Sequence, residues 1–447
     1  MQEDKLKNMA KWLLIAFGFV LIIFALFSLK TTFHDTSEYI SIAKNLAGIN
    51  NVDIFSTHSL LYPAIISIFL KIWPSFAMIK LVNCLWLFLI SLTLFFWLKN
   101  YKAFILFAFS PIVWIVSIQT TPILPASFFF LLAWIFLKKT DLPYNQLYSG
   151  LFLGLSCAIY DVVFLIAAIF LLCYFYNKKV SNFALYLAFM FLGFLPRLIF
   201  DFWMFDMPFY SLIRFFGANM VFSLGLSGYS NFQILKNLEW IAVFFAISPF
   251  LFKLYKLSVN NKQDFAFLGI SFAILLLRTG TLKYFLIIAP IMLICLSAEL
   301  SNKKVKWHCI MGLFLMLFFT WNYFTFEQDS LARFDLNKII DETHANYIVS
   351  GPFEADYLST FLWAPSPKII WFEDYQASLQ NKTAIRKYTF EFNSDKIRLR
   401  DKLVVSGGFE RIDNRTYENA IIVSRNKNLA NFNLNKCYEY LCVYDGL

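Results

Sequence analysis

The first long apolar run and the polar segment behind it decide the fold: Trp12-Leu-Leu-Ile-Ala-Phe-Gly-Phe-Val-Leu-Ile-Ile-Phe-Ala-Leu-Phe-Ser-Leu29, then Lys30-Thr-Thr-Phe-His34-Asp35-Thr-Ser-Glu38. A helix that crosses a bilayer needs about 20 apolar residues. No small-residue cleavage site follows Leu29, so the run lacks the layout of a removable secretory signal. We expect a retained signal-anchor helix over 12–29 that leads into a polar loop on the far side of a membrane.

The composition indicates that lipid surrounds much of the chain. Of the 447 residues, 59% are hydrophobic and only 15% are charged, and 55 are phenylalanine. A soluble domain of ordinary composition has about 25% charged residues. The composition therefore excludes a soluble enzyme, a disordered chain and a small disulfide-bonded scaffold.

Charge divides the chain into two parts at Phe326. Residues 327–447 contain 15 basic and 17 acidic residues, whereas residues 1–326 contain 24 basic and 12 acidic residues. We expect a transmembrane domain over 1–326, with an outer-face loop at 30–75, and a soluble domain over 327–447, a length that is ordinary for a domain. The basic excess lies wholly in the apolar part, which favours Lys and Arg in cytoplasmic loops over a nucleic-acid partner, and we expect no such partner.

Apolar runs that are long enough to cross a bilayer, or nearly so, recur along the first part. The eleven predicted spans are 12–29, 76–98, 103–118, 122–137, 147–160, 162–176, 181–200, 232–252, 264–278, 282–299 and 307–325. With the N-terminus inside, every inner loop carries lysines, and the outer loops carry Asp35, Glu38, Asp53, Asp161, Asp201 and Asp206. Since eleven is odd, the positive-inside rule predicts a cytoplasmic N-terminus and a C-terminal domain outside the plasma (inner) membrane.

Two stretches leave alternatives for the span count. Residues 147–176 could form one tilted helix, but that helix would move Lys178 and Lys179 outside and bury Asp161 in the membrane, so we favour a broken pair. Residues 59–73 could form a twelfth span, but the stretch is short and contains Pro63, which favours an interfacial or re-entrant helix.

The C-terminal part alternates short β-rich runs with polar stretches. The predicted strands are Tyr347–Ser350, Lys368–Glu373, Lys402–Ser406, Ala420–Ser424 and Tyr440–Tyr444. Segments of helical or loop character separate them, so we expect a small extracytoplasmic α/β domain. Cys437 and Cys442 lie in this domain, where oxidation permits a disulfide, and no Cys/His cluster in the sequence has the spacing of a zinc site.

The acidic segment after the first span is the strongest candidate for chemistry. Ile42 and Leu46 follow Glu38 and Tyr39 at helical spacing, which predicts an amphipathic helix on the outer membrane surface. Asp35 and Glu38 have the spacing of a helix capping box. An acid in this place, next to His34, is also positioned to accept a proton from a substrate, and both interpretations remain open.

Other polar residues of the outer face are candidates for substrate binding. His58 and Tyr62 lie at the start of the 59–73 segment, and Asp161 lies alone at the predicted break in 147–176, where an acid needs water or a partner. Cations in outer loops run against the positive-inside trend and suit a phosphate: Arg214, Arg278 and Lys283, the last beside Tyr284. Their alternative role is snorkelling at a span end.

Four motifs in this order resemble the integral-membrane glycosyltransferases of the GT-C fold, which use polyprenyl-phosphate sugars and include protein O-mannosyltransferases and lipid A aminoarabinose transferases. The motifs are Asp35 with Glu38-Tyr39 and Ala43; Leu61-Tyr62-Pro63; Gly150-Leu-Phe-Leu-Gly154-Leu155-Ser156, which also fits helix packing; and Lys283-Tyr284-Phe-Leu with Pro290. The chain departs from its relatives at Thr57-His58, where they often carry an Arg, and at Tyr160-Asp161, where they often carry Arg or Lys.

The resemblance implies a GT-C-like fold of about 11 spans and a direct displacement. An acceptor attacks the anomeric carbon of the donor sugar, and polyprenyl phosphate leaves. Asp35 would be the general base, Glu38 is the other catalytic candidate with no role assigned, and Arg214, Arg278 or Lys283 would neutralise the phosphate. The remaining candidates, which would bind substrate, are His34, His58, Tyr62, Asp161 and Tyr284.

The resemblance also implies the partners of the chain. They are a polyprenyl-phosphate sugar as donor, a lipid, glycan or protein as acceptor, and membrane lipid. No nucleotide cofactor is expected and no residue is assigned to a metal, although whether a divalent metal joins Asp35 stays open.

Other classes of membrane protein compete with this one. A transporter or flippase of a lipid-linked glycan predicts an internal repeat and broken helices with polar groups at the bilayer midplane, and we find no repeat of the first half in the second. A glycan polymerase or ligase predicts a large outer loop rich in Arg and His, and a plain scaffold leaves the outer acids and cations unexplained. A glycosyltransferase at the outer face is therefore the first hypothesis, and the transporter or flippase is the alternative.

Overall fold

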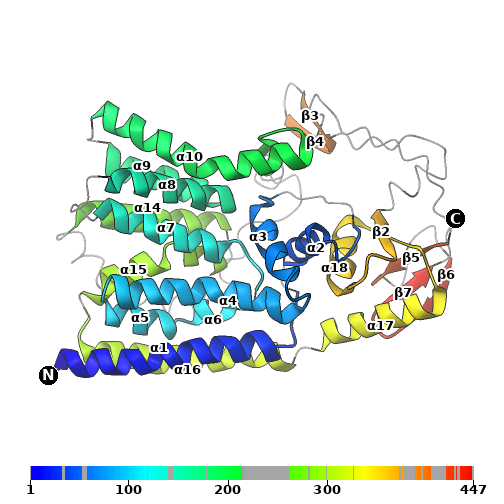
Figure 1. Ribbon diagram of the computed structural model, residues 1–447, viewed down its shortest axis with the longest axis horizontal. Coiled ribbons are helices and arrows are strands. Elements are labelled where there is room, and N and C mark those ends of the chain that lie inside the picture. The colour runs from blue at the N-terminus through cyan, green and yellow to red at the C-terminus, as the bar shows by residue number, and fades with distance from the viewer. Residues whose placement is uncertain are drawn as a thin grey trace.

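The computed structural model describes most of the chain. The described residues are 2–32, 36–52, 58–117, 119–138, 144–176, 179–213, 215, 261–279, 282–298, 300–325, 327–371, 375, 388–393, 396–403, 419–426, 429 and 433–444. The structure is mostly helical, with a bundle of helices that lie roughly side by side at one end and a small sheet at the other (Figure 1).

Helices occupy the predicted spans in order. They are α1 (Gln2–Phe27), α4 (Phe76–Leu92) with a π-helical turn η1 (Thr93–Trp97), α5 (Tyr101–Ala108), α6 (Pro111–Ser117), α7 (Ile123–Lys138), α8 (Asn145–Ile159), α9 (Val163–Phe175), α10 (Val180–Phe205), α14 (Lys262–Thr279), the 3₁₀ helix η2 (Leu282–Ile287), α15 (Ala289–Ser297) and α16 (Asn302–Thr325). The predicted span 232–252 lies outside the described residues. Among those described, three helices are long and apolar enough to cross a membrane: Leu6–Phe27, Phe76–Trp97 and Val180–Phe205.

The structure interrupts the apolar runs in several places, among them 147–176, 103–118 and 282–299. The break that we predicted in 147–176 is confirmed, because α8 ends at Ile159 and α9 begins at Val163. The predicted span 103–118 is instead two short helices, α5 and α6, with Pro111 at the start of the second. Proline has no N–H and disfavours a helical residue before it, and the Trp114 Nε1 donates to the Ala108 carbonyl oxygen that the break leaves open, at 2.7 Å.

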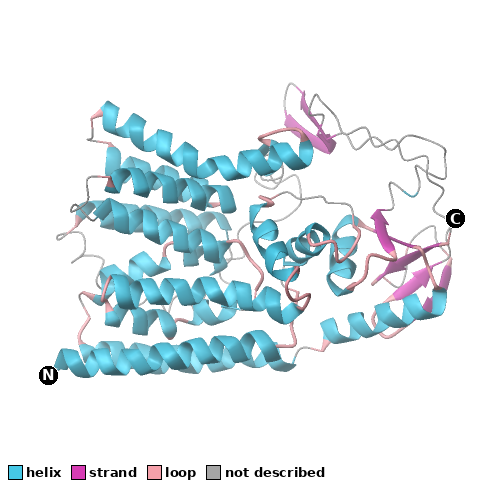
Figure 2. Cartoon of the chain, in the orientation of Figure 1, coloured by secondary structure: helices cyan, strands magenta, loops and turns pink. Residues whose placement is uncertain are grey.

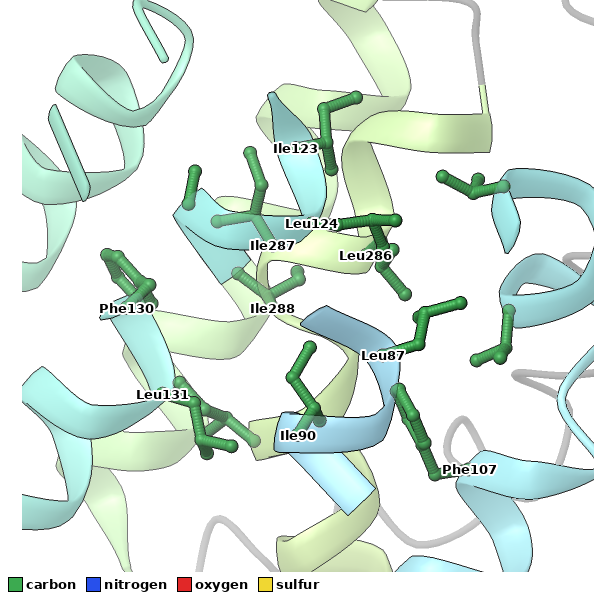
Figure 3. Packing of buried hydrophobic residues seen from close by; sticks show 14 of the residues in the cluster. Leu87, Ile90, Phe107, Ile123, Leu124, Phe130, Leu131, Leu286, Ile287 and Ile288 are labelled. Carbon is green, nitrogen blue, oxygen red and sulfur yellow. The ribbon is translucent and has the colours of Figure 1, made fainter. Parts of the chain in front are cut away.

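The helices pack around an apolar core. Leu87 and Ile90 of α4 meet Phe130 and Leu131 of α7, together with residues 286–288 around the end of η2 (Figure 3). Large apolar side chains also point away from the protein, among them Trp12 and Phe19 of α1 and Phe314 of α16. Apolar surface of this extent is typical of helices that face lipid.

Glycines bring α8 and α10 into close contact. A Cβ atom at Gly154 would overlap the Met190 carbonyl oxygen, and one at Gly193 would overlap the Leu151 carbonyl oxygen. The expectation that Gly150 and Gly154 serve helix packing is therefore confirmed, since small residues let two backbones approach closely.

The turns that carry lysines gather at one end of the bundle. The Asn100 amide donates to the Ser297 hydroxyl at 2.8 Å, and the Lys102 ammonium donates to the Leu300 carbonyl oxygen at 2.9 Å. At the same kind of turn, Lys138 at the end of α7 pairs with Asp264 at the start of α14 at 3.0 Å. The structure thus brings together turns that we predicted on the same side, while the side of the membrane on which they lie remains a prediction.

The C-terminal region (residues 327–447) contains a mixed sheet. Its elements are α17 (Gln328–Thr343), β1 (Tyr347–Ser350), α18 (Pro352–Phe361), β2 (Lys368–Trp371), β5 (Ala420–Ser424), β6 (Leu434–Cys437) and β7 (Cys442–Tyr444), with a separate hairpin of β3 (Tyr388–Asn393) and β4 (Lys396–Leu403) (Figure 2). The strand order is β2-β1-β5-β7-β6, where β1 is parallel to β2 and β5, and β7 is antiparallel to β5 and β6.

The predicted strands match this sheet closely. Tyr347–Ser350 and Ala420–Ser424 are β1 and β5 with the expected bounds, whereas the run 402–406 meets the structure only at the end of β4. The sequence analysis did not identify β3, although aromatic and polar residues alternate along it, or β6, which is mostly polar. Cys437 and Cys442 are joined by a disulfide between β6 and β7.

Two short helices lie between the bundle and the sheet (Figure 1). They are α2 (Thr36–Leu46) and α3 (Leu61–Leu70), which correspond to the two outer-face helices that we predicted. The expected position of α2 on the membrane surface is not what the structure shows, because its residues 39–44 are buried against α3 and α18. Its apolar residues Tyr39, Ile40 and Ala43 join the core of the bundle, whereas Ser41 and Lys44 contact α18 of the C-terminal region, which no local sequence pattern reveals.

Candidate functional site

The candidate site lies where the bundle meets α2 and α3. It contains Asp161 between α8 and α9, His58 just before α3, Arg197 of α10 and Tyr284 of η2. The polar ends of these elements meet here because α8 stops at Ile159 and its C-cap, Tyr160, is extended. The broken helix therefore exposes Asp161 to side chains from elements that are far apart in the sequence.

Asp161 is the centre of the site. One carboxylate oxygen, Oδ1, lies 2.6 Å from the Arg197 Nη2, and the other, Oδ2, lies 3.7 Å from the His58 Nδ1. The Ser59 backbone N–H also points to Oδ2, at 3.4 Å. Burial raises the pKa of Asp161, but the Arg197 guanidinium and His58 outweigh it and hold the pKa below the ordinary value of a carboxyl group. The carboxylate is therefore ionised and already neutralised by a cation.

Arg197 links Asp161 to a second carboxylate. Its side chain is 1% exposed, and its Nε donates to the Ser211 hydroxyl at 2.9 Å. Ser211 in turn donates its hydroxyl and its backbone N–H to the Asp201 Oδ2, at 2.6 and 3.1 Å. The Arg197 Nη1 has no hydrogen-bond acceptor among the residues that the structure describes. A buried guanidinium with an unused N–H group can bind a further anion.

Aromatic rings surround His58, whose side chain is 18% exposed. The ring centroids of Tyr39 and Phe215 both lie 5.8 Å from that of His58, and the centroid of Tyr160 lies 6.4 Å away. Tyr160 stacks on Tyr284 at 6.1 Å. These rings form a wall that offers apolar faces next to charged groups, a combination typical of sites for small polar ligands.

Two other predicted residues adjoin this wall. The Tyr62 ring packs against Tyr39 at 6.1 Å, and its hydroxyl donates to the Asn83 Oδ1 at 2.9 Å. The Lys283 ammonium lies 5.5 Å from the centre of the Tyr284 ring, which brings a second cation to the side of the site formed by η2. The structure therefore brings together five of the predicted residues: His58, Tyr62, Asp161, Lys283 and Tyr284.

Glu38 lies on α2 beside Tyr39 and faces the C-terminal region. The pKa of Asp356 on α18 is raised well above the ordinary value, by burial first and by the neighbouring Glu38 carboxylate second. Asp356 also has a hydrogen bond with Ser41, one turn after Glu38 on α2. Glu38 is thus at the contact between α2 and α18.

The remaining predicted residues cannot be placed in the site. His34, Asp35 and Arg214 lie outside the described residues, and only the backbone of Arg278 is described, in α14. Their roles remain predictions.

The sequence analysis did not select Arg197, Asp201, Tyr39 or Tyr160 as site residues. Arg197 did carry a signal, since it is a charge inside the predicted span 181–200. A charge at such a depth requires a partner, and that partner is the isolated Asp161. The sequence shows both charges, but only the tertiary structure shows that they form a pair.

No metal site is apparent among the described residues, since no group of three His, Cys, Asp or Glu side chains is arranged to hold an ion. The charged groups of the site are instead a guanidinium with two carboxylates, beside a histidine. This set can hold an anionic group and orient a polar ligand beside it.

Comparison with known proteins adds one finding. No protein family matches the sequence, and no curated protein matches it. The structure is similar to the crystal structure of ArnT from Cupriavidus metallidurans bound to undecaprenyl phosphate, with a TM-score of 0.48 and 12% sequence identity over 78% of this chain and 74% of that chain.

Proposed function

We propose that this protein is a membrane glycosyltransferase of the GT-C type that moves a sugar from a polyprenyl-phosphate donor to an acceptor at the outer face of the membrane. The observation that carries the proposal is the buried Arg197 guanidinium. Its Nη1 has no acceptor among the described residues, and its partner Asp161 also faces His58, which the aromatic wall surrounds. The apolar surface of the bundle would take the polyprenyl chain, and the guanidinium would take its phosphate.

Arg197 suits the phosphate because a guanidinium is always charged and offers several N–H groups in one plane. Asp161 and Ser211 hold it in place through Nη2 and Nε, so Nη1, to which the described part of the chain offers no acceptor, is preorganised and needs no rotation to bind an oxygen. Lys283 is the second cation that we assign to the phosphate, as the sequence motifs implied. Its charge would help to stabilise the negative charge that develops on the leaving group.

The aromatic wall suits the sugar. The C–H faces of a sugar ring are apolar, and its hydroxyl groups require donors and acceptors, which matches rings set beside polar groups. Tyr39, Tyr160 and Tyr284 would supply the faces, and His58 would donate to or accept from a sugar hydroxyl. Asp161 would act on the sugar only through His58, because it is itself buried.

The reaction is a displacement at the anomeric carbon. The acceptor oxygen or nitrogen forms a bond to that carbon, the bond from carbon to phosphate oxygen breaks, and polyprenyl phosphate leaves with the electron pair. The acceptor proton passes to a carboxylate, for which we propose Asp35, with Glu38 as the second acid. A general base of this kind typically contributes about 10²–10⁴ in rate.

The orientation that accompanies this proposal is a cytoplasmic N-terminus and an extracytoplasmic C-terminal region in the inner membrane. It rests on the lysine pattern of the loops. The acceptor is a lipid, a glycan or a protein.

The proposal is tested with purified protein in lipid vesicles and a panel of radiolabelled polyprenyl-phosphate sugars, with a cell-envelope lipid and glycan extract as acceptor. We expect acceptor-dependent release of polyprenyl phosphate, which Arg197→Gln abolishes. Lys138→Gln is the matched control, because it also removes one cation from a buried carboxylate but at Asp264, remote from the site. Movement of intact donor between leaflets, without cleavage, would support the flippase instead.

A further inference from the structure

The segment around α2, which carries the proposed acid Glu38, is held by the C-terminal region as well as by α3 and the bundle. Asp329, in the first turn of α17, is buried and accepts four hydrogen bonds from Thr31 and Thr32. The two backbone N–H groups donate at 2.7 and 2.9 Å, and the two hydroxyls at 2.9 and 2.6 Å. A single carboxylate therefore fixes the chain where it leaves α1.

Lys44 fixes the other side of the segment. It is 0% exposed, and its ammonium donates to the carbonyl oxygens of Ser359 at 3.0 Å, Thr360 at 2.9 Å and Leu362. These carbonyls belong to the C-terminal end of α18, where unpaired C=O groups and the helix dipole favour a cation. The Trp363 ring covers the ammonium at 4.1 Å. All three N–H donors of the lysine thus point into the C-terminal region.

Further contacts continue this interface past α2. The Ser41 and Ser359 hydroxyls are 3.0 Å apart, and the Asn50 amide donates to the Ser359 hydroxyl at 2.5 Å. Val52 then forms a parallel bridge with Ile369 of β2 and belongs to the apolar core of the C-terminal region. Residues 31–52 therefore join the C-terminal region at their start, middle and end.

The register of α2 against α18 sets the position of Glu38. Residues three apart lie on one face of a helix, so Glu38 shares a face with Ser41, and Asp356 shares a face with Ser359. Because Ser41 and Ser359 touch, Glu38 and Asp356 are brought opposite each other. The C-terminal region thus determines where one of the proposed acids stands relative to the bundle.

We propose that the C-terminal region is a fixed clamp that positions α2, which carries Glu38, beside the Asp161 site, with Asp329 and Lys44 as its positioning residues. The proposal rests on the proposed function for its catalytic part. A reacting group that is displaced by about 1 Å can lose roughly a hundredfold in rate, so loosening the clamp acts on the chemical step. Donor binding depends chiefly on Arg197, Tyr160 and Tyr284, which lie outside the clamped segment, and Tyr39 is the ring of the aromatic wall that α2 carries.

Asp329→Asn tests the clamp in the full-length protein. The amide cannot accept four hydrogen bonds, and its NH₂ group opposes the Thr31 and Thr32 donors. We expect kcat to fall about a hundredfold while KM for the donor stays within about threefold, because the ground-state contacts of the donor are intact. Glu342→Gln is the matched control on the same helix, since Glu342 pairs only with Lys436 and Tyr438 inside the C-terminal region. An equal loss in both variants, or a rise in KM alone, would overturn the assignment.

Hydrogen exchange separates the clamp from the proposed function, because it needs no activity. The backbone amides of 36–46 should exchange at least tenfold faster in Asp329→Asn and in Lys44→Met than in the wild type or in Glu342→Gln. Thr32→Val removes the 2.6 Å hydrogen bond of the Thr32 hydroxyl and should give a smaller increase in exchange. It replaces Asp329→Asn in the experiment if that variant does not fold. Unchanged exchange in all three variants contradicts the clamp whether or not the protein transfers sugar.

A cross-link distinguishes a fixed clamp from a lid that opens in each cycle. The Ser41 and Ser359 hydroxyls are close enough for the double variant Ser41→Cys/Ser359→Cys to form a disulfide. We expect the oxidised variant to keep at least half of the rate of its reduced form. Loss of transfer on oxidation, with recovery on reduction, would show that the C-terminal region must undock and would refute the fixed clamp.

Discussion

Two buried carboxylates at opposite ends of α9 differ in how completely they are paired. Asp264 accepts from the Trp134 Nε1 at 3.1 Å, from the Tyr174 hydroxyl and from the Asn261 amide at 2.5 Å, and it pairs with Lys138 at 3.0 Å. Asp161, before the start of α9, pairs with Arg197 and His58, and this network leaves the Arg197 Nη1 without an acceptor among the described residues.

The difference indicates what each network is for. A buried polar cluster whose members are all satisfied stabilises and orients a fold, and the Asp264 network ties α7, α9 and α14 together in this way. A cluster that leaves a buried donor open carries a free-energy penalty that only a ligand removes. We therefore assign structure to the Asp264 network and ligand binding to the Asp161 network.

The largest expected effect comes from removing the proposed base. Asp35→Asn should lower the transfer rate by about 10²–10⁴, because the acceptor loses the group that takes its proton. The melting temperature in detergent and the affinity for donor lipid should stay at wild-type values, as both depend on other residues. Rate, melting and lipid binding are measured on one preparation, and a variant with full activity would remove Asp35 from the mechanism.

Removing the cation from each carboxylate tests the comparison directly. Arg197→Gln should lower the free energy of unfolding by about 3–5 kcal/mol, because it leaves Asp161 buried and unpaired. It should also abolish binding of polyprenyl phosphate. Lys138→Gln should destabilise the protein less, since the Lys138 side chain is partly exposed and Asp264 keeps three other donors.

The readouts for this pair are denaturant unfolding in detergent and binding of radiolabelled polyprenyl phosphate per folded molecule. Wild-type lipid binding in Lys138→Gln, with loss in Arg197→Gln, supports the division between the two networks. Equal losses of binding would contradict it.

A smaller effect is expected at the aromatic wall. Tyr284→Leu keeps apolar volume but removes the ring that stacks on Tyr160, an interaction of about 0.5–1.5 kcal/mol. We expect KM for the donor to rise about threefold to tenfold, with kcat little changed. Phe130→Leu, a ring change inside the bundle core, serves as the control and should leave KM alone.

The smallest effect concerns a third buried carboxylate, Asp356. Burial, and then Glu38, raise its pKa in the folded state, so the folded protein keeps this proton at a pH where the unfolded chain has released it. Stability contributed by the neutral form is therefore full below the ordinary pKa of an aspartate and falls as the pH rises toward the raised value. The asparagine in Asp356→Asn does not titrate. The melting temperature of this variant, minus that of the wild type, should therefore increase as the pH rises from 4 to 8. A constant difference over this range would argue against the shift.

Much of the fold was accessible from the sequence because it follows from local patterns. Apolar length predicted the helices of the bundle, and the charge of Asp161 predicted the break between α8 and α9. Short runs of consecutive β-branched and apolar residues predicted β1 and β5 to the residue. Polar strands such as β6 were not predicted, because apolar and polar residues do not alternate along them.

The site was accessible only in part, for a different reason. His58, Asp161 and Tyr284 could each be selected as polar residues in places where polarity is costly. The pairing of Asp161 with Arg197 could not be, because it depends on how α10 crosses the broken helix. The contacts from Thr31 to Asp329 and from Lys44 to α18 join segments about 300 residues apart, and no local pattern encodes them.

The sequence by itself determined that this protein is a bundle of apolar helices with a small α/β region behind it, because solvent preference acts on each segment separately. Only the tertiary structure decided that Arg197 pairs with Asp161 and that α18 of the C-terminal region forms hydrogen bonds with α2. Those contacts depend on which segments, distant in sequence, pack against one another. A buried charge is tolerated only where the fold brings a partner of opposite charge to it.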